Sequence, residues 1–139
     1  MTSSRPDRFN VLIASAGRRV GLLQTFRETL SALGLQGEVL AVDMNPQAAA
    51  YQLADRAWTV PRCTDDAFIP AMRELCERER VDLLIPTIDT ALGTWAHHRG
   101  LFADIGTTIA VSSPQTIAIA SDKLRTHRWL TDEDFPTVR

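Results

Sequence analysis

Five short apolar runs, separated by stretches with helical periodicity, limit the folds open to this chain more than any other feature. The runs occupy residues 9–15, 38–43, 57–60, 81–86 and 107–111. Each run is mostly continuous in apolar residues, which is typical of strands buried on both faces of a sheet. Because strands of this kind alternate here with helical patterns, the sequence predicts an α/β fold with a parallel sheet.

The stretches between the runs carry helix signals. Apolar residues recur on one helical face at Val20, Leu23, Phe26, Leu30 and Leu33, and again at Phe68, Met72, Leu75 and Cys76. Ser113 and Pro114 are typical of the cap and first turn of a helix, and a short helix is expected around residues 46–54. Right-handed crossovers between these elements predict a Rossmann-like three-layer αβα sandwich, with about five parallel strands in the order 3-2-1-4-5.

Length and composition point to one globular domain. A chain of 139 residues, 45% hydrophobic and 23% charged, fits a single core, expected over residues 9–139 after a polar tail at residues 1–8. The net charge of -2 gives no overall attraction to nucleic acid or to anionic membranes. Low cysteine content, without an apolar run long enough for a membrane span or a signal peptide, favours a cytoplasmic protein.

The predicted strand order places a ligand crevice between the first strand and the fourth. It brings residues 15–19 (SAGRR) beside residues 86–90 (PTIDT), with Asp43 on one flank. Arg18 and Arg19 are expected in the first turn of a helix, where the helix dipole disfavours cations. A bound anion would explain both arginines, because backbone N–H groups and guanidinium groups would converge on it. The alternative is that both side chains extend into water.

The same turn argues against a dinucleotide bound in the NAD manner. That fingerprint needs glycines at three positions, which correspond here to Ser15, Gly17 and Val20, so only the middle one matches. Asp43 ends the second strand, as a ribose-binding acid would. A turn-forming residue is the alternative role for Asp43.

Asp89 and the histidines do not define a catalytic or metal site. Asp89 precedes a helical stretch, so it is interpreted either as an N-cap or as a carboxylate that lines the crevice. His97 and His98 are adjacent and point to different sides of a helix. Since the chain has no metal-ligand spacing and no Ser-His-Asp or Cys-His arrangement, we assign neither a metal nor a catalytic residue.

Lys123 repeats the arrangement of the two arginines. Ser121 or Asp122 can cap a helix whose first turn contains this lysine, which again places a cation at the unfavourable pole of a helix. A phosphate contact and a solvated side chain are the two interpretations of Lys123.

Four ordered blocks give the chain a resemblance to a known family. They are NVLIASAGRRVGLL (10–23), VLAVDMNPQAAAYQLADRAWTVPR (39–62), VDLLIPTIDTAL (81–92) and VSSPQTIAIASDKLRTHRWLTDEDFPTV (111–138). Together they resemble the amino-terminal, pre-ATP-grasp domain of ATP-grasp enzymes similar to the carbamoyl-phosphate synthase large chain. Members of that family use ATP and Mg²⁺ to join a carboxylate to an amine or another nucleophile through an acyl phosphate.

The resemblance implies that this domain forms one wall of a substrate site. Its candidate residues for binding an anionic substrate group are Ser15, Gly17, Arg18, Arg19, Asp43, Thr87 and Asp89. Among them, Asp89 would orient the nucleophile or an arginine, and Ser15 and Thr87 would donate hydrogen bonds at the rim. Lys123, the lysine of the DK block, would approach the nucleotide phosphates.

The sequence ends at FPTVR, where the family would enter its two-part ATP clamp and the acidic residues that hold Mg²⁺. We therefore predict a ligase domain that is incomplete alone, requires a missing ATP-grasp domain or a split partner chain, and by itself holds neither ATP nor Mg²⁺ tightly. One alternative is a stand-alone module that binds a nucleotide or small anion. Another is a structural subunit of a split ligase, in which Trp129, Leu130 and Phe135 form an interaction patch and the chain associates as a homodimer.

Overall fold

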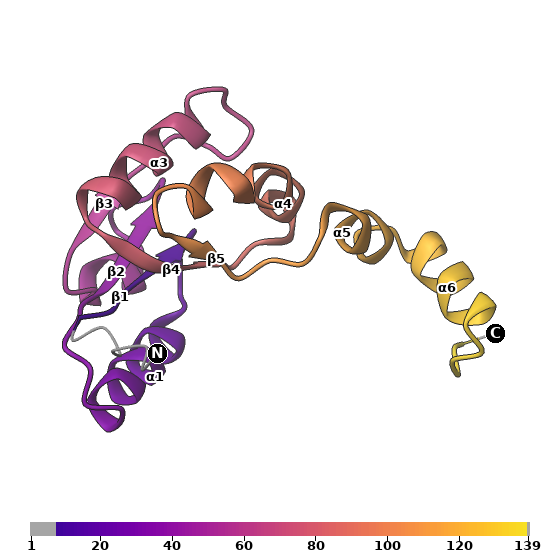
Figure 1. The fold of residues 1–139 in the computed structure, drawn as a ribbon, viewed down its shortest axis with the longest axis horizontal. Coiled ribbons are helices and arrows are strands. Elements are labelled where there is room, and N and C mark those ends of the chain that lie inside the picture. The colour runs from indigo at the N-terminus through magenta and orange to yellow at the C-terminus, as the bar shows by residue number, and fades with distance from the viewer. Residues whose placement is uncertain (1–7, 139) are drawn as a thin grey trace, which may run out of the picture.

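A parallel sheet organises the fold. The computed structural model of the chain describes residues 8–138 and contains a five-stranded sheet in the order β3-β2-β1-β4-β5 (Figure 1). The strands are β1 (Asn10–Ala14), β2 (Val39–Asp43), β3 (Ala57–Thr59), β4 (Val81–Pro86) and β5 (Thr108–Ile109). All four strand pairs are parallel, which confirms the predicted sheet and its order. Only β5 is much shorter than its apolar run, because the Val111 N–H bonds back to the Ile109 carbonyl and turns the chain away.

In the part of the chain that the structure describes, four helices lie between the strands, and two more follow β5. They are α1 (Val20–Ala32), α2 (Ala49–Leu53), α3 (Phe68–Arg78), α4 (Asp89–Ala103), α5 (Pro114–Ala120) and α6 (Lys123–Asp132). The helix expected around residues 46–54 is confirmed in a shorter form as α2. None of the helices in the described part of the chain is long and apolar enough to cross a membrane.

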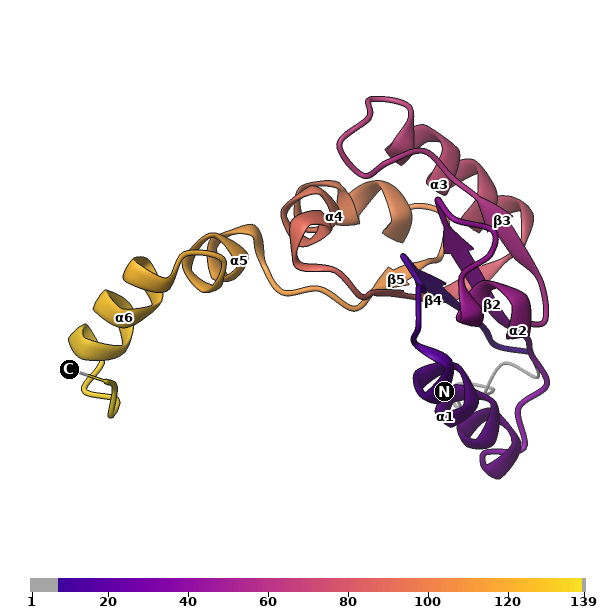
Figure 2. The same cartoon turned by 180° about the vertical axis from the view of Figure 1, so that it is seen from behind.

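Alternating side chains of the central strands divide the core into two clusters. Leu12 of β1 belongs to the cluster that contains α3 and α4 side chains, whereas Ile13 belongs to the cluster that contains α1 and α2 side chains. Phe68, Trp95 and Phe102 form consecutive edge-to-face pairs with ring centroids 5.2 Å and 5.5 Å apart on the first face. Figure 2 shows the two helix layers on opposite sides of the sheet, which confirms a three-layer sandwich.

The last two helices project from this sandwich. Both ribbon views show α5 and α6 leading away from the sheet, so that α5 contacts α4 and α6 contacts α5 (Figures 1 and 2). None of the residues in α5 and α6 is fully buried. Ser113 caps α5 with Pro114 at its first position, and Asp122 rather than Ser121 caps α6. The family resemblance extends into this arm, but the body of the core ends at β5.

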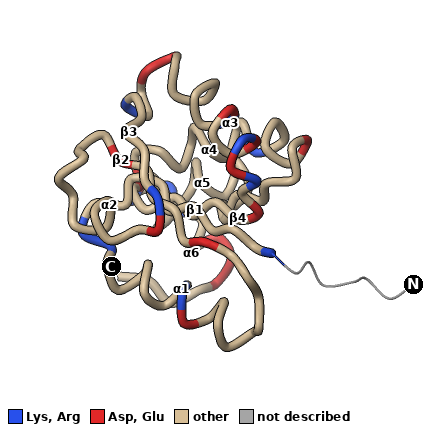
Figure 3. The backbone as a smooth tube through the Cα atoms, turned by 90° about the vertical axis from the view of Figure 1, so that its left-hand side faces the viewer, with Lys and Arg blue, Asp and Glu red and all other residues tan. Residues whose placement is uncertain are grey.

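The amino-terminal edge of the sheet carries a chain of ion pairs. Glu38, just before β2, binds both Arg8 and Arg56, and Arg56 also binds Glu79, just before β4, at 2.6 Å. Arg78 binds the same Glu79. Figure 3 shows acidic and basic residues interspersed over the described chain. Arg8 also forms an isolated parallel bridge with Gln36, before β1, and residues 1–7 of the predicted tail lie outside the described part.

Candidate pocket at the carboxyl edge of the sheet

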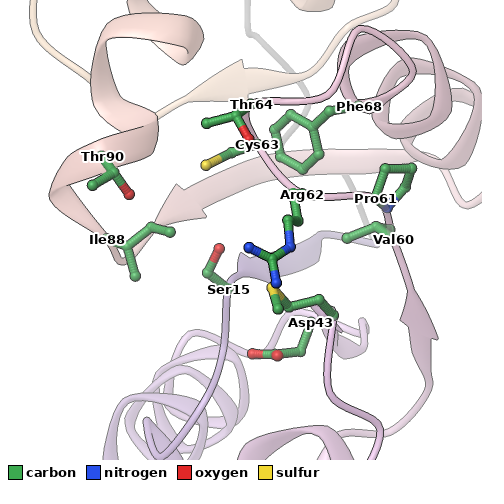
Figure 4. Close-up of a pocket in the computed structure, with 11 residues that line it drawn as sticks. Ser15, Asp43, Val60, Pro61, Arg62, Cys63, Thr64, Phe68, Ile88 and Thr90 are labelled. Carbon is green, nitrogen blue, oxygen red and sulfur yellow. The ribbon is translucent and has the colours of Figure 1, made fainter.

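A pocket of about 280 Å³ lies where the strands end. Its lining comes from the ends of β1, β2 and β4 and from the segment after β3: Ser15, Asp43, Met44, Val60, Pro61, Arg62, Cys63, Thr64, Phe68, Ile88 and Thr90 (Figure 4). Ligands of doubly wound sheets bind in this position, at the point where the strand order reverses. The pocket is therefore the strongest candidate for a binding site.

The turn between β1 and α1 is shaped by residues with left-handed backbone. Ser15 has φ 57° and Gly17 has φ 48°. The N–H of Ala16 bonds the Val42 carbonyl, and the N–H of Gly17 bonds Oδ2 of Asp43 at 2.8 Å. The other carboxylate oxygen of Asp43 accepts the Asn45 N–H at 2.9 Å. Asp43 is thus a turn-forming residue, the second of the two interpretations, and it fixes the turn beside the pocket.

Arg18 and Arg19 lie before α1 and not in its first turn, so that expectation is wrong. The helix begins at Val20, because the backbone of its N-cap, Arg19, is not helical (φ -78°, ψ 43°). Both arginines are exposed, and neither lines the pocket. Arg19 donates a hydrogen bond to the carbonyl of Thr87 at 3.3 Å. This bond links the β1 turn to the end of β4, as the strand order predicts.

The hydroxyl of Thr87 faces the strand ends. It donates to the carbonyls of Ala14 at 3.0 Å and Ser15 at 2.7 Å. Thr87 therefore joins the two strands on either side of the crevice, and its proton is already engaged. Ser15, in contrast, lines the pocket and presents its side chain there (Figure 4).

Asp89 and Lys123 lie together in a second depression, of about 510 Å³, between α4, α5 and the start of α6. Asp89 is the first residue of α4 and not its N-cap, which is Ile88, so the capping interpretation is wrong. An acidic residue in the first turn still complements the helix dipole. Thr90 lines both this depression and the first pocket, so the two hollows adjoin along the start of α4.

Arg62 and Cys63 are pocket residues that the sequence analysis missed. They follow β3, whose end lies beside the end of β2, and Figure 4 shows Arg62 extending across the pocket towards Ser15 and Asp43. Within residues 8–138, Arg62 forms no ion pair. Ligands of such sheets bind at the carboxyl ends of the strands, and the sequence analysis considered the ends of the first, second and fourth strands. Including the end of the third strand would have identified Arg62 and Cys63.

The described residues do not form a metal site. No three His, Cys, Asp or Glu side chains within residues 8–138 are grouped so that they could hold a metal ion. The adjacent imidazoles of His97 and His98 each bond a carbonyl one turn back in α4, those of Gly93 and Thr94.

With the pocket defined, comparison with known proteins identifies the family. A sequence model described as "PylC-like, N-terminal domain" matches residues 11–110. The chain belongs to this family. Formate-dependent phosphoribosylglycinamide formyltransferase from Thioalkalivibrio sulfidiphilus is 36% identical over 89 residues, which cover 63% of this chain and 20% of the relative. The PylC-like chain thus spans about one fifth of the length of that relative.

Solved structures show the same fold at low sequence identity. The biotin carboxylase domain of Hydrogenobacter thermophilus 2-oxoglutarate carboxylase has a TM-score of 0.61 at 18% identity, over 94% of this chain and 29% of that chain. Rhizobium etli pyruvate carboxylase has a TM-score of 0.61 at 13% identity, over 95% of this chain and 13% of that chain. The family match and the curated relative confirm the predicted resemblance to the amino-terminal region of ATP-grasp enzymes, and the solved structures show the same fold. Because so much of the PylC-like chain is covered, the likeness reaches into the α5–α6 arm.

Proposed function

We propose that this PylC-like chain is the substrate-side domain of an ATP-dependent ligase of the ATP-grasp type, which joins a carboxylate to an amine or another nucleophile. The observation that carries the proposal is the pocket at the strand-order reversal, with the unpaired Arg62 across it and Arg18 and Arg19 on the adjoining turn. A concave site with a few converging polar groups is the usual form of a small-molecule site. The whole enzyme would place its reacting groups opposite this wall.

The role we propose for the β1 turn depends on its side chains. The Gly17 N–H is bonded to Asp43, so Gly17 would contribute the shape of the turn, and an anion there would be held by Arg18 and Arg19. Guanidinium groups bind carboxylates and phosphates through two parallel hydrogen bonds. Ser15 would add a hydroxyl on the pocket side.

The second depression is our candidate for the nucleotide phosphates. Lys123 lines it from the start of α6 and is the only lysine of the chain. Its ammonium group forms no ion pair within the described residues, which suits contact with a phosphate. Asp89 lines the same depression and would orient a nucleophile or a cationic group. ATP, when bound, would supply the phosphoryl group that activates the carboxylate, and Mg²⁺ would need ligands from outside the described residues.

The α5–α6 arm supports a requirement for further protein. Leu124, Trp129 and Phe135 are exposed by 69%, 42% and 54%, and Trp129 stacks on Phe135 at 5.8 Å. A helix with such residues on its surface is stabilised when another protein surface covers them. We propose that the remainder of an ATP-grasp enzyme, in the same chain or in a partner, is that cover. Contact with that protein surface would also explain why Trp129 and Phe135 are exposed in this chain.

The first prediction concerns ATP turnover. We expect the 139-residue chain to bind ATP weakly or not at all and to show no ATPase activity, because its described residues offer no Mg²⁺ site. The protein encoded by the complete reading frame, or the chain supplemented with its partner, is expected to form ADP in the presence of a carboxylate. Coupled assays measure ADP formation by the 139-residue chain and by the complete or supplemented protein. Lys123→Ala should lower the rate of the complete or supplemented protein by about tenfold to a hundredfold.

Two results would contradict the proposal. ATP turnover by the purified 139-residue chain would show that it is complete without further residues. Micromolar binding of NAD, ATP or a phosphorylated metabolite by that chain, measured by calorimetry, would instead support a stand-alone binding module. Arg99→Ala is the matched control for Lys123→Ala, because Arg99 is exposed on α4 and lines neither hollow.

A further inference from the structure

We propose that the pocket at the carboxyl edge binds a small carboxylate with an aliphatic body, and that Arg62 is the residue that anchors the carboxylate group. This inference rests on the proposed function, since it names the chemical class of the substrate that the domain would hold. It also assigns a binding role to the segment after β3, residues 60–64, none of which is among the candidate site residues taken from the sequence.

Within residues 8–138, no acidic side chain forms an ion pair with Arg62. At the opposite edge of the sheet, Arg8 and Arg56 are both paired with Glu38. In the pocket, the acidic lining residue is Asp43, and its two oxygens accept the N–H groups of Gly17 and Asn45. A guanidinium that extends across a pocket without forming an ion pair is a site for an anion supplied from solution.

The backbone of the β1 turn favours a carboxylate over a phosphate as the anion. Phosphates in α/β folds are usually held by free N–H groups in the turn after the first strand. Here the N–H groups of Ala16, Gly17 and Arg19 bond within the protein, and of residues 15–19 only Ser15 lines the pocket, so this turn gives the pocket no such cradle. Without that cradle, one guanidinium with its parallel donors matches one carboxylate better than a dianionic phosphate.

The rest of the ligand is defined by the apolar walls. Half of the ten residues that line the pocket with Arg62 are apolar: Met44, Val60, Pro61, Phe68 and Ile88. The pocket has a volume of about 280 Å³. That is enough for a metabolite the size of an amino acid or a short fatty acid, and below the roughly 300–1,000 Å³ of sites for larger ligands. The geometry therefore favours an aliphatic monocarboxylate of about six carbons.

The chain contains its own reporter of pocket occupancy. Cys63 lines the pocket and is partly exposed. The other cysteine, Cys76, is 1% exposed, and burial raises the pKa of its thiol to about 12, so it stays protonated and unreactive at neutral pH. Alkylation of the folded chain by iodoacetamide, followed by mass spectrometry, therefore measures access to Cys63.

The experiment compares the alkylation rate of Cys63 with and without three probes: hexanoate, hexylamine and inorganic phosphate. Hexanoate should slow alkylation at least threefold at saturation, with half-maximal protection at about 1 mM, as expected for a ligand of this size. Hexylamine and phosphate at the same concentration should leave the rate within about 1.5-fold of that of the free chain, since neither combines a carboxylate with an aliphatic body.

Arg62→Gln tests the anchor. It should raise the hexanoate concentration for half-maximal protection at least tenfold, because it removes the charge and the parallel donors but keeps a polar side chain. Arg99→Gln, on an exposed part of α4, should leave the value unchanged. Equal protection by hexylamine, stronger protection by phosphate, or an unchanged value in Arg62→Gln would each overturn the inference.

The outcome is separable from that of the proposed function. Protection of Cys63 requires neither ATP nor a complete enzyme, so it is measured on the 139-residue chain. Carboxylate binding without ADP formation by the complete protein would leave the pocket assignment standing and reject the ligase. ADP formation with an unprotected Cys63 would support the ligase and place its substrate elsewhere.

Discussion

At the scale of single residues, Asp43 shows how one carboxylate can determine the shape of a turn beside a pocket. Its oxygens accept the N–H groups of Gly17 at 2.8 Å and Asn45 at 2.9 Å, and the side chain is nearly buried. These two bonds hold the β1 turn against the end of β2. They also remove the Gly17 N–H from any anion-binding role.

Asp43→Ala should destabilise the chain by about 2–4 kcal/mol, because it leaves two backbone donors without their charged acceptor. Urea unfolding followed by circular dichroism measures the change in the free energy of unfolding. The exposed Asp66, changed to alanine, is the control, and its effect should stay within about 0.5 kcal/mol. If the two variants were equally stable, the bonds of Asp43 would not be what fixes the turn.

At the scale of elements, the helix ends separate what local sequence controls from what it does not. Ser113 and Asp122 cap α5 and α6 through side-chain bonds to backbone N–H groups, as their sequences predict. Asp89 has the same kind of sequence context but lies one position inside α4, because Ile88 takes the extended cap conformation at the end of the crevice. Ile88 also packs against the core cluster that contains α3 and α4 side chains, a contact that the local sequence around Asp89 does not encode.

The cap of α6 should make that helix sensitive to acid. Hydrogen bonds from the backbone N–H groups of Arg125 and Leu124 lower the pKa of Asp122 below its usual value. A carboxyl whose pKa is lower in the folded state stabilises the fold above its usual pKa, and this contribution is lost as the pH falls below about 4. We expect the amides of α6 to exchange faster with solvent as the pH drops through this range, after correction for intrinsic exchange.

Two substitutions at Asp122 separate the capping bond from the charge. Asp122→Asn keeps an oxygen acceptor but cannot titrate. At pH 6 the α6 amides of this variant should be protected from exchange about as well as those of the unmodified chain, and their protection should no longer fall at acid pH. Asp122→Ala should lower the protection at both pH values. A pH dependence in Asp122→Asn equal to that of the unmodified chain would assign the acid effect to another group.

At the scale of the whole molecule, the two edges of the sheet differ in chemistry. The amino-terminal edge joins the starts of several strands through ion pairs of Arg56 with Glu38 and Glu79, and Arg56 also lies over the Trp58 ring at 5.4 Å. At the carboxyl edge, Arg62 lines a pocket and forms no ion pair with any residue in the described part of the chain. One edge is thus stabilised by its own charges, while the other retains a charge for a ligand.

Arg56→Ala should lower the free energy of unfolding by about 1–2 kcal/mol, since it removes two exposed ion pairs and a cation–π contact. The loss should shrink in 1 M NaCl, because salt screens exposed pairs but hardly affects packing on Trp58. Thermal and urea unfolding at two salt concentrations measure this, with Arg99→Ala as the control. A loss that did not depend on salt would mean that packing alone accounts for the effect.

The sequence by itself determined the elements, their order and the edge of the sheet at which a ligand would bind. It could do so because apolar periodicity and capping residues act locally, and because right-handed crossovers then permit few strand orders. The family resemblance rested on the same local blocks. The sequence also identified Asp43 as a candidate, but it left open whether this residue binds a ribose or forms a turn.

Only the tertiary structure decided which side chains share a hollow. It separated Arg18 and Arg19 from the pocket, placed Asp89 with Lys123 beside it, and brought Arg62 in from the segment after β3. Hydrogen bonds between strand ends, such as that from Gly17 to Asp43, join residues far apart in the chain. The position of a functional side chain depends on such long-range contacts, and no local pattern of sequence contains them.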